Sequence, residues 1–149
     1  RQVGAREGVI AVEHMFNENP LPINYDQMPK CVYTSPEIAS IGVNQETAKQ
    51  RGLNFKVVKA PFRANGKAMI ESANQPEGFA ELLFEKDSES FIGASLVGPH
   101  TTELINELSV LHFMNGSSIE LGLSTHAHPS ISELMMELGL KMNNQSIHI

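Results

Sequence analysis

The sequence predicts an α+β domain in which antiparallel strands come first and helices close the chain. Residues 80–85 and 92–96 alternate between apolar and other side chains on either side of a short polar run, which is typical of a β-hairpin. The last third of the chain instead carries leucines and methionines at helical spacing, with helix-capping residues at the segment boundaries.

Residues 1–22 differ from the rest of the chain. The short apolar run Val9–Val12 predicts a strand, and residues 17–22 combine turn-forming residues with two prolines, as a linker does. An N-terminal arm packed on the same domain is the alternative. Because the chain begins with Arg1 and shows no signal-peptide pattern, we expect a processed chain or an excised piece.

The elements that follow alternate between strand and helix. Residues 30–34 and 38–43 predict two strands interrupted by Ser35-Pro36-Glu37, and Asn44 predicts the N-cap of a short helix that stops at Gly52. Residues 53–62 predict a further strand, and Asn65-Gly66 predicts a turn.

Three helical segments complete the chain. The first begins at Thr101 or Thr102 and ends at Asn115-Gly116, and Ser117-x-x-Glu120 has the form of a capping box for a brief second one. The third spans residues 131–142 and is apolar on more than one side, because Met136 and Leu140 lie opposite its main stripe. We therefore expect this helix to contact another subunit, so that the domain self-associates.

Composition excludes several classes of protein. With 41% hydrophobic and 19% charged residues the chain should fold, and its net charge of −6 without a basic stripe argues against a nucleic-acid partner. The longest apolar run falls short of the roughly 20 residues that span a bilayer, so no membrane segment is expected. A single cysteine, Cys31, allows no internal disulfide. The chain also lacks a glycine-rich nucleotide loop and a cysteine pair of its own.

Residues 124–133 carry the only constellation that suggests chemistry, and three interpretations compete for it. Ser130-x-x-Glu133 has the form of a capping box that begins the last helix. Alternatively, His126 and His128 point the same way from an extended segment and share a metal ion with His112 or His100. In the third interpretation His128 is an acid–base group, and Glu133, kept ionised at a helix start, fixes its tautomer.

The run His126-Ala127-His128-Pro129-Ser130-Ile131-Ser132-Glu133 resembles the His-x-His-Pro-Thr/Ser-x-Ser/Thr-Glu signature of the dihydrolipoamide dehydrogenases. That family belongs to the FAD-dependent pyridine nucleotide-disulfide oxidoreductases. Residues 32–42, 61–68 and 92–99 resemble further segments of the family, in the family's order. The likeness covers nearly the whole chain.

The resemblance implies that this chain is only the C-terminal dimerisation (interface) domain, an antiparallel sheet of about five strands flanked by helices. Residues 1–22 would be the remnant of the FAD domain and a linker, and residues 23–149 the dimerisation domain. The parent would be a homodimer that oxidises dihydrolipoamide with FAD and NAD. Its partner would be the lipoyl-bearing protein of a 2-oxo acid dehydrogenase or glycine cleavage complex, in the cytoplasm or the mitochondrial matrix. The fragment alone should bind no cofactor and be inactive.

For the site, the resemblance makes His128 the acid–base catalyst and Glu133 the residue that orients it, with no metal. It also implies a cis peptide before Pro129 and contact between the backbone of His128 and the FAD of the partner subunit. Two alternatives stay open: the interface domain of a glutathione or mercuric reductase type of enzyme, and a non-catalytic dimerisation module. Cys31 is expected to be a small buried residue. Four histidines show no partner pattern that indicates a role: His14, His100, His112 and His148.

Overall fold

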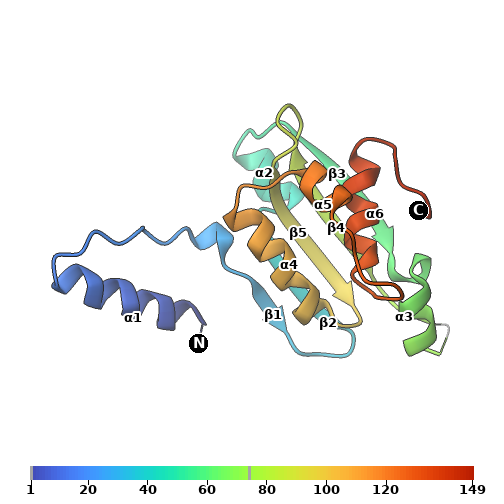
Figure 1. The fold of residues 1–149 in the computed structure, drawn as a ribbon, viewed down its shortest axis with the longest axis horizontal. Coiled ribbons are helices and arrows are strands. Elements are labelled where there is room, and N and C mark those ends of the chain that lie inside the picture. The colour runs from blue at the N-terminus through green and yellow to red at the C-terminus, as the bar shows by residue number, and fades with distance from the viewer. Residues whose placement is uncertain (1, 74) are drawn as a thin grey trace.

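The computed structural model describes residues 2–73 and 75–149, and an antiparallel sheet of five strands forms its centre (Figure 1). In chain order the strands are β1 (Lys30–Val32), β2 (Glu37–Gly42), β3 (Phe55–Pro61), β4 (Phe79–Glu85) and β5 (Phe91–Gly98). In space they follow the order β1-β2-β5-β4-β3, and all neighbours are antiparallel. The predicted hairpin is confirmed as β4–β5, and the α+β fold class is confirmed with it.

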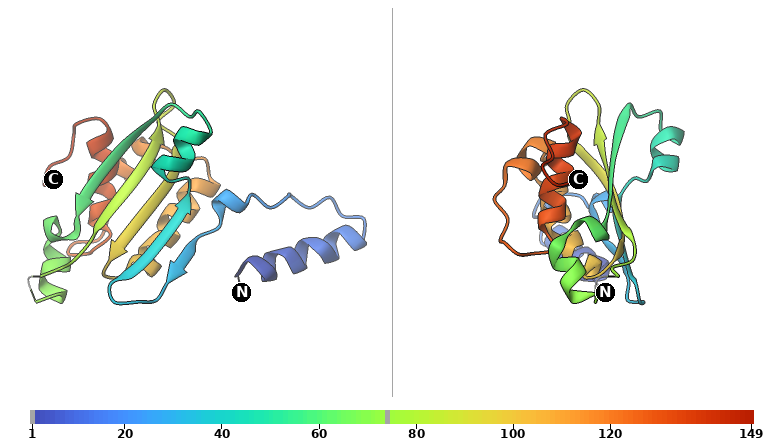
Figure 2. Two further views of the ribbon diagram at one scale, coloured as in Figure 1. Left: turned by 180° about the vertical axis from the view of Figure 1, so that it is seen from behind. Right: turned by 90° about the vertical axis from the view of Figure 1, so that its right-hand side faces the viewer.

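The helices lie on both sides of this sheet. In chain order they are α1 (Gln2–Met15), α2 (Gln45–Gln50), α3 (Gly66–Glu71), α4 (Thr101–Phe113), α5 (Ser118–Leu123) and α6 (Glu133–Met142). Helices α4, α5 and α6 cover one face, whereas α2 lies against the other (Figure 2). Two predicted caps are confirmed: Asn44 caps α2, and Ser117 and Glu120 form a capping box on α5. None of the helices in the described part of the chain has the length and apolar character needed to cross a membrane.

The main core lies between the sheet and helices α4 to α6. Alternate residues of the central strands β4 and β5 point to this side, where they meet leucines of α4 and α6. Burying one such leucine or phenylalanine contributes about 1.5–3 kcal/mol. A smaller cluster under α2, built from Val43, Ala48 and Leu83, packs against the opposite face. The fully buried large side chains of the main core include Phe62, Leu82, Phe84, Leu96, Leu108, Leu134 and Leu138.

Two local predictions are wrong. Residues Val9–Val12 belong to helix α1 rather than to a strand. No strand lies alongside them in the described structure, and a helix satisfies its backbone groups internally where an unpaired strand does not. Asn65-Gly66 is the start of α3 rather than a simple turn, because the Asn65 side chain accepts a hydrogen bond from the Ala68 N–H.

The second apolar side of α6 is partly covered within the chain itself. Leu140 packs on Gly122 of α5, where the two helices approach so closely that a Cβ on Gly139 would lie 2.6 Å from the Gly122 nitrogen. Met136 is partly buried. Part of this side of α6 is therefore covered by α5 of the same chain.

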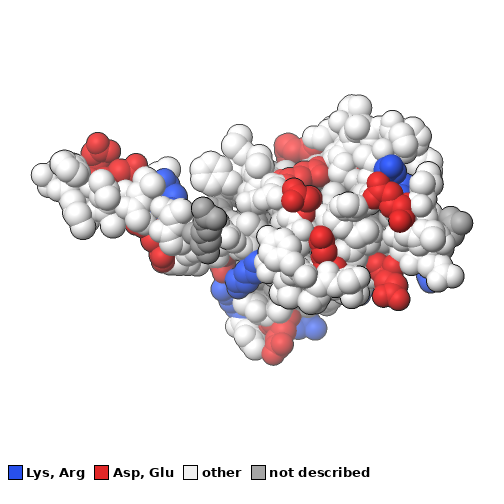
Figure 3. Space-filling model, turned by 90° about the horizontal axis from the view of Figure 1, so that it is seen from below, with Lys and Arg blue, Asp and Glu red and all other residues white. Residues whose placement is uncertain are grey.

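Helix α1 stands apart from the sheet, with the extended segment 18–24 between them (Figure 1). It has no buried residue, although Tyr25 donates a hydrogen bond of 2.8 Å to the Glu7 carboxylate. On the face seen in Figure 3, acidic side chains are spread over both α1 and the main body, and basic side chains form small separate groups.

Candidate functional site

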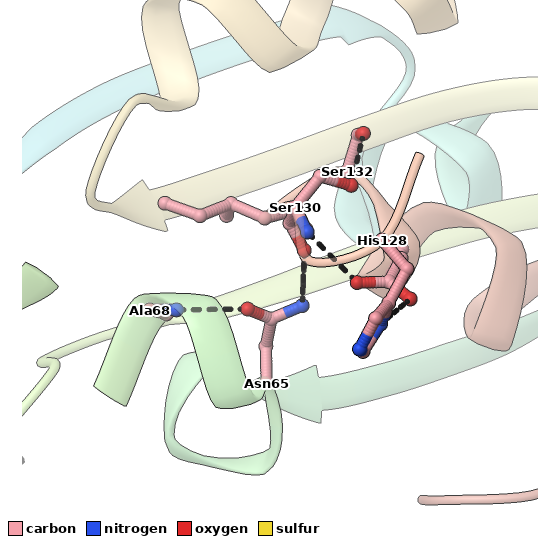
Figure 4. Close-up of polar contacts among 7 residues, drawn as sticks. Asn65, Ala68, His128, Ser130 and Ser132 are labelled. Carbon is pink, nitrogen blue, oxygen red and sulfur yellow. Dashed lines mark hydrogen bonds and ion pairs between the residues drawn. The ribbon is translucent and has the colours of Figure 1, made fainter. Parts of the chain in front are cut away.

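The loop between α5 and α6 carries His128, and the first residue of α6 is Glu133. His128 Nδ1 lies 2.9 Å from Glu133 Oε1 (Figure 4). The His128 side chain is 83% exposed, whereas that of Glu133 is 24% exposed. Nε2 makes no hydrogen bond with any described residue, so one edge of the ring is held and the other is open to whatever lies outside the chain. The His128–Pro129 peptide is cis, as the resemblance implies.

Glu133 uses both of its carboxylate oxygens. While Oε1 faces the histidine, Oε2 accepts a hydrogen bond of 2.8 Å from the Ser130 N–H. This backbone bond and, after it, the contact with His128 lower the pKa of Glu133 below its ordinary value. Glu133 is therefore ionised at neutral pH, and an ionised carboxylate can only accept. Nδ1 of His128 must then carry the proton of the shared hydrogen bond, which leaves the lone pair of a neutral ring on Nε2.

The predicted capping box at Ser130 forms only in half. Glu133 returns to the Ser130 N–H as predicted, but Ser130 Oγ pairs with Ser132 Oγ at 3.0 Å instead of capping the helix. Ser132 occupies the N-cap position without a side-chain cap bond, and α6 begins two residues later than predicted, at Glu133. The carboxylate thus holds the turn that precedes the helix as well as the histidine.

Asn65 is a buried residue of this site that sequence reasoning missed. Its side chain is held by the Ala68 N–H at the start of α3, and its amide donates to the Ser130 carbonyl at 3.0 Å and more weakly to that of Ile131 (Figure 4). This one side chain therefore ties α3 to the loop that presents His128. The signal that could have found it is the helix-capping preference of asparagine ahead of the apolar residues of α3.

The ring of His126 is held by other groups of its own chain. The side chain is 8% exposed and uses both ring nitrogens within its own chain, Nδ1 at 2.8 Å from the Ser124 carbonyl and Nε2 at 2.5 Å from Glu107 Oε1. The interpretation that the two histidines point the same way and share a metal ion is therefore wrong. No group of three or more metal-ligating side chains occurs in the part of the chain that the structure describes.

A cleft of about 540 Å³ opens beside the pair. We call it the His128 cleft and define it by residues from three parts of the chain: 64–67 with Ile70, then 128–129, 133–134 and 136–137, and finally 147–149. Its walls combine apolar side chains such as Ile70, Met136 and Ile147 with the polar groups Asn65, Lys67, His128, Glu133, Glu137 and His148.

The structure places the remaining candidates outside the pair. His14 lies exposed on α1, and His100 Nε2 lies 2.8 Å from Glu71 Oε2 at the start of α4. His112 is partly buried on α4, and its burial lowers its pKa. Cys31 is partly buried on the edge strand β1, where burial raises the pKa of the thiol, so the chain does not activate it as a nucleophile. Of the four histidines without a predicted partner, only His148 lines the His128 cleft.

Comparison of the sequence with known proteins identifies the family of the chain. Residues 28–138 match the dimerisation domain of the pyridine nucleotide-disulphide oxidoreductases. The chain is 37% identical over 146 residues to the dihydrolipoyl dehydrogenase of Bacillus subtilis (strain 168), which covers 98% of this chain and 30% of that protein. It is 33% identical over 143 residues to the mitochondrial dihydrolipoyl dehydrogenase of Pisum sativum, covering 96% of this chain and 28% of that protein.

Solved structures show the same architecture. LpdA from Mycobacterium tuberculosis superposes with a TM-score of 0.87 at 27% identity, over 95% of this chain and 30% of that one. The HOCl-induced flavoprotein disulfide reductase RclA from Escherichia coli shares the fold, with a TM-score of 0.75 at 23% identity over 87% of this chain and 30% of that chain.

The chain spans about 30% of the length of the curated relatives that it matches. The matched region runs from the segment before β1 to the middle of α6, and it therefore includes both the sheet and the loop that carries His128. This chain belongs to the pyridine nucleotide-disulphide oxidoreductase family, and it corresponds to the dimerisation domain of its dihydrolipoyl dehydrogenase-type members.

Proposed function

We propose that the chain supplies the acid–base group of a dihydrolipoyl dehydrogenase, with His128 as the catalyst and Glu133 as the residue that orients it. The observation that carries this proposal is the divided environment of the His128 ring. Nδ1 is held at 2.9 Å by a carboxylate, while the side chain remains 83% exposed. A histidine that served only to stabilise its own chain would gain nothing from keeping its second nitrogen open.

The chemistry follows from the protonation state of the pair. Nε2 of the neutral ring takes the proton of a substrate thiol, so the S–H bond breaks and an N–H bond forms. The thiolate then attacks a disulfide sulfur, which releases a second thiolate, because only thiolates attack disulfides at a useful rate. Glu133 stabilises the imidazolium through Nδ1–H. Glu133 is the side chain that holds His128 within its own chain. In this proposal the disulfide and the flavin belong to the partner subunit of a homodimer.

The family implies that the parent binds FAD and NAD. Of the residues in this chain, only those around His128 fit a contact with one of these cofactors. This chain offers the open ring edge and the backbone at His128–Pro129, on the rim of the cleft, to a flavin of the partner subunit. Bound to the parent, FAD and NAD would supply the two-electron acceptor chemistry that the thiol–disulfide step requires. In this proposal the dithiol arrives on the lipoyl-bearing protein of a 2-oxo acid dehydrogenase or glycine cleavage complex.

A His128→Gln variant of the full-length parent tests the assignment. We expect the turnover of dihydrolipoamide to fall by roughly two or more orders of magnitude, because general acid–base groups contribute about 10²–10⁴-fold. FAD content and thermal stability should stay near those of the wild type, because the ring is exposed. His100→Gln, which changes a histidine that pairs with Glu71 outside the His128 cleft, is the matched control and should keep its activity.

Two other functions remain as outcomes of the same measurement. In a non-catalytic module, Glu133 acts only through its bond to the Ser130 N–H. Glu133→Ala then lowers stability by about 0.5–2 kcal/mol, as the loss of a cap does, without lowering turnover. In a related flavoprotein disulfide reductase, His128→Gln lowers the reduction of another disulfide, and the wild type does not turn over dihydrolipoamide.

A further inference from the structure

Residues 147–149 form one wall of the His128 cleft. Ile147, His148 and Ile149 all line the cleft together with His128 and Glu133. The Ile149 side chain packs against the main core, and Ser146 Oγ donates to the Ile149 carbonyl at 2.7 Å. Ile147, in contrast, is 74% exposed, so its side chain does little to hold the wall in place.

The wall is held instead by a buried carboxylate of α6. Glu137 is 4% exposed, and its Oε2 accepts the backbone N–H of Ile147 at 2.9 Å and that of His148 at 3.1 Å. Its Oε1 is buried and has no hydrogen-bond partner among the described residues. A buried carboxylate is costly unless it is hydrogen-bonded, and leucine or methionine occupies the neighbouring buried positions of this helix. The two backbone bonds are therefore the contribution that this glutamate makes.

Glu133 and Glu137 lie one helical turn apart and so project from the same side of α6. The first contacts the ring of His128, and the second contacts the backbone of residues 147–148, which line the same cleft. A single rigid helix thus fixes both the acid–base group and the segment beside it. A shift of residues 147–148 would change the width of the cleft without moving the ring.

We propose that Glu137 is a positioning residue that holds residues 147–148 as the wall along which a thiol-bearing substrate reaches His128. The proposal rests on the proposed function of His128. The apolar part of the cleft, with Ile70, Met136 and Ile147, suits an alkyl chain that ends in the reacting sulfur. Loss of the clamp should impair substrate capture and leave proton transfer at His128 intact.

The experiment compares Glu137→Leu with Glu137→Gln in the full-length enzyme. Leucine fills the volume but accepts no hydrogen bond, whereas glutamine keeps one acceptor oxygen. With leucine we expect the backbone amides of residues 147 and 148 to exchange with solvent about tenfold faster or more, the equivalent of one net hydrogen bond. We also expect the KM for dihydrolipoamide to rise about tenfold, because the loss of one net hydrogen bond would weaken substrate binding by about this factor. The kcat and its pH profile should stay nearly unchanged. Glutamine should restore most of both properties.

A second variant covers the case in which leucine at 137 prevents folding. Ile147→Pro removes one of the two donated N–H groups and leaves Glu137 in place, so it should raise the KM and speed exchange at His148. In the double variant the KM should rise no further than in Glu137→Leu alone, because leucine at 137 already removes both bonds.

Several results would overturn the proposal. Unchanged exchange in Glu137→Leu would show that the clamp does not hold the segment, and faster exchange with an unchanged KM would show that the segment does not guide the substrate. An equal defect in Glu137→Gln and Glu137→Leu would assign the effect to charge instead of the acceptor. Failure of the proposed function is recognised separately, as full activity of His128→Gln, and the exchange measurement at residues 147 and 148 stands in that case.

Discussion

The carboxylate of Glu133 serves two neighbours at once, the Ser130 N–H and the His128 ring. Both contacts favour its ionised form and lower its pKa, the backbone bond being the larger cause. An unfolded glutamate titrates at about 4.3, and the folded one titrates below that. The stabilisation that Glu133 contributes is therefore complete above about pH 5 and is lost as the pH falls through the unfolded and then the folded pKa.

This sign predicts how Glu133→Gln behaves in urea unfolding. The variant should be less stable than the wild type at pH 7, and the difference should narrow as the pH is lowered from about 5 to 3, because protonated glutamate resembles glutamine. Most of this narrowing should persist in a His128→Gln background, since the Ser130 N–H remains. A difference that stays constant with pH would show that ionisation of Glu133 does not contribute to the stability of the loop.

Among single residues, the histidine–carboxylate pair was within reach of the sequence, whereas Asn65 was not. His128 and Glu133 are five residues apart around a proline, so local geometry brings them together. Asn65 meets the same loop from 65 residues away, and its neighbour Gly66 favoured a turn. Only the packing of α3 against the loop reveals that the asparagine both caps a helix and donates to Ser130. Glu137 was hidden for the same reason, because its contacts join α6 to residues that follow the helix.

At the scale of elements, sequence patterns correctly predicted the hairpin and the helix caps that depend on residues close together in the chain. The β4–β5 hairpin, the Asn44 cap and the capping box of α5 depend on neighbouring residues and are confirmed. The strand predicted at Val9–Val12 is wrong, because β-branched residues favour a strand only where a partner strand exists. The packing of α5 on α6 at Leu140 was not predicted, because helical periodicity describes a face but does not identify the element that packs on it.

The contact of α5 with α6 gives an element-scale prediction. A Cβ at Gly139 would come within 2.6 Å of the Gly122 nitrogen, so the backbones would have to separate. Gly139→Ala should lower the free energy of unfolding by about 1–3 kcal/mol in urea titrations, as other overpacking substitutions do. Gly8→Ala is the matched control, because a Cβ there meets nothing within 4 Å, and it should not destabilise the chain. Equal stability of the two variants would contradict close packing of the two helices.

At the scale of the whole molecule, one group of exposed apolar side chains lies on the helical side of the sheet, over α4 and α5. The side chains of Val110, Phe113 and Met114 on α4 and of Ile119 and Leu123 on α5 are each more than half exposed. Both helices lie on the same face of the sheet (Figure 1). We call this surface the α4–α5 patch. Because the chain matches a dimerisation domain, we infer that this patch forms the contact between two subunits.

The α4–α5 patch predicts how the chain behaves in solution. Sedimentation should show self-association, and Phe113→Glu should weaken it by at least about tenfold, because a charge that is buried at a contact without a partner costs more than 1.4 kcal/mol. Tyr33→Glu is the control, because this aromatic side chain is 80% exposed in the segment between β1 and β2, away from the patch. If Tyr33→Glu weakens association as much as Phe113→Glu, the contact lies elsewhere. A wild-type chain that stays monomeric at high concentration would mean that the patch is covered by a part of the parent outside this sequence, and the ring of His128 would then have to reach its disulfide without help from this surface.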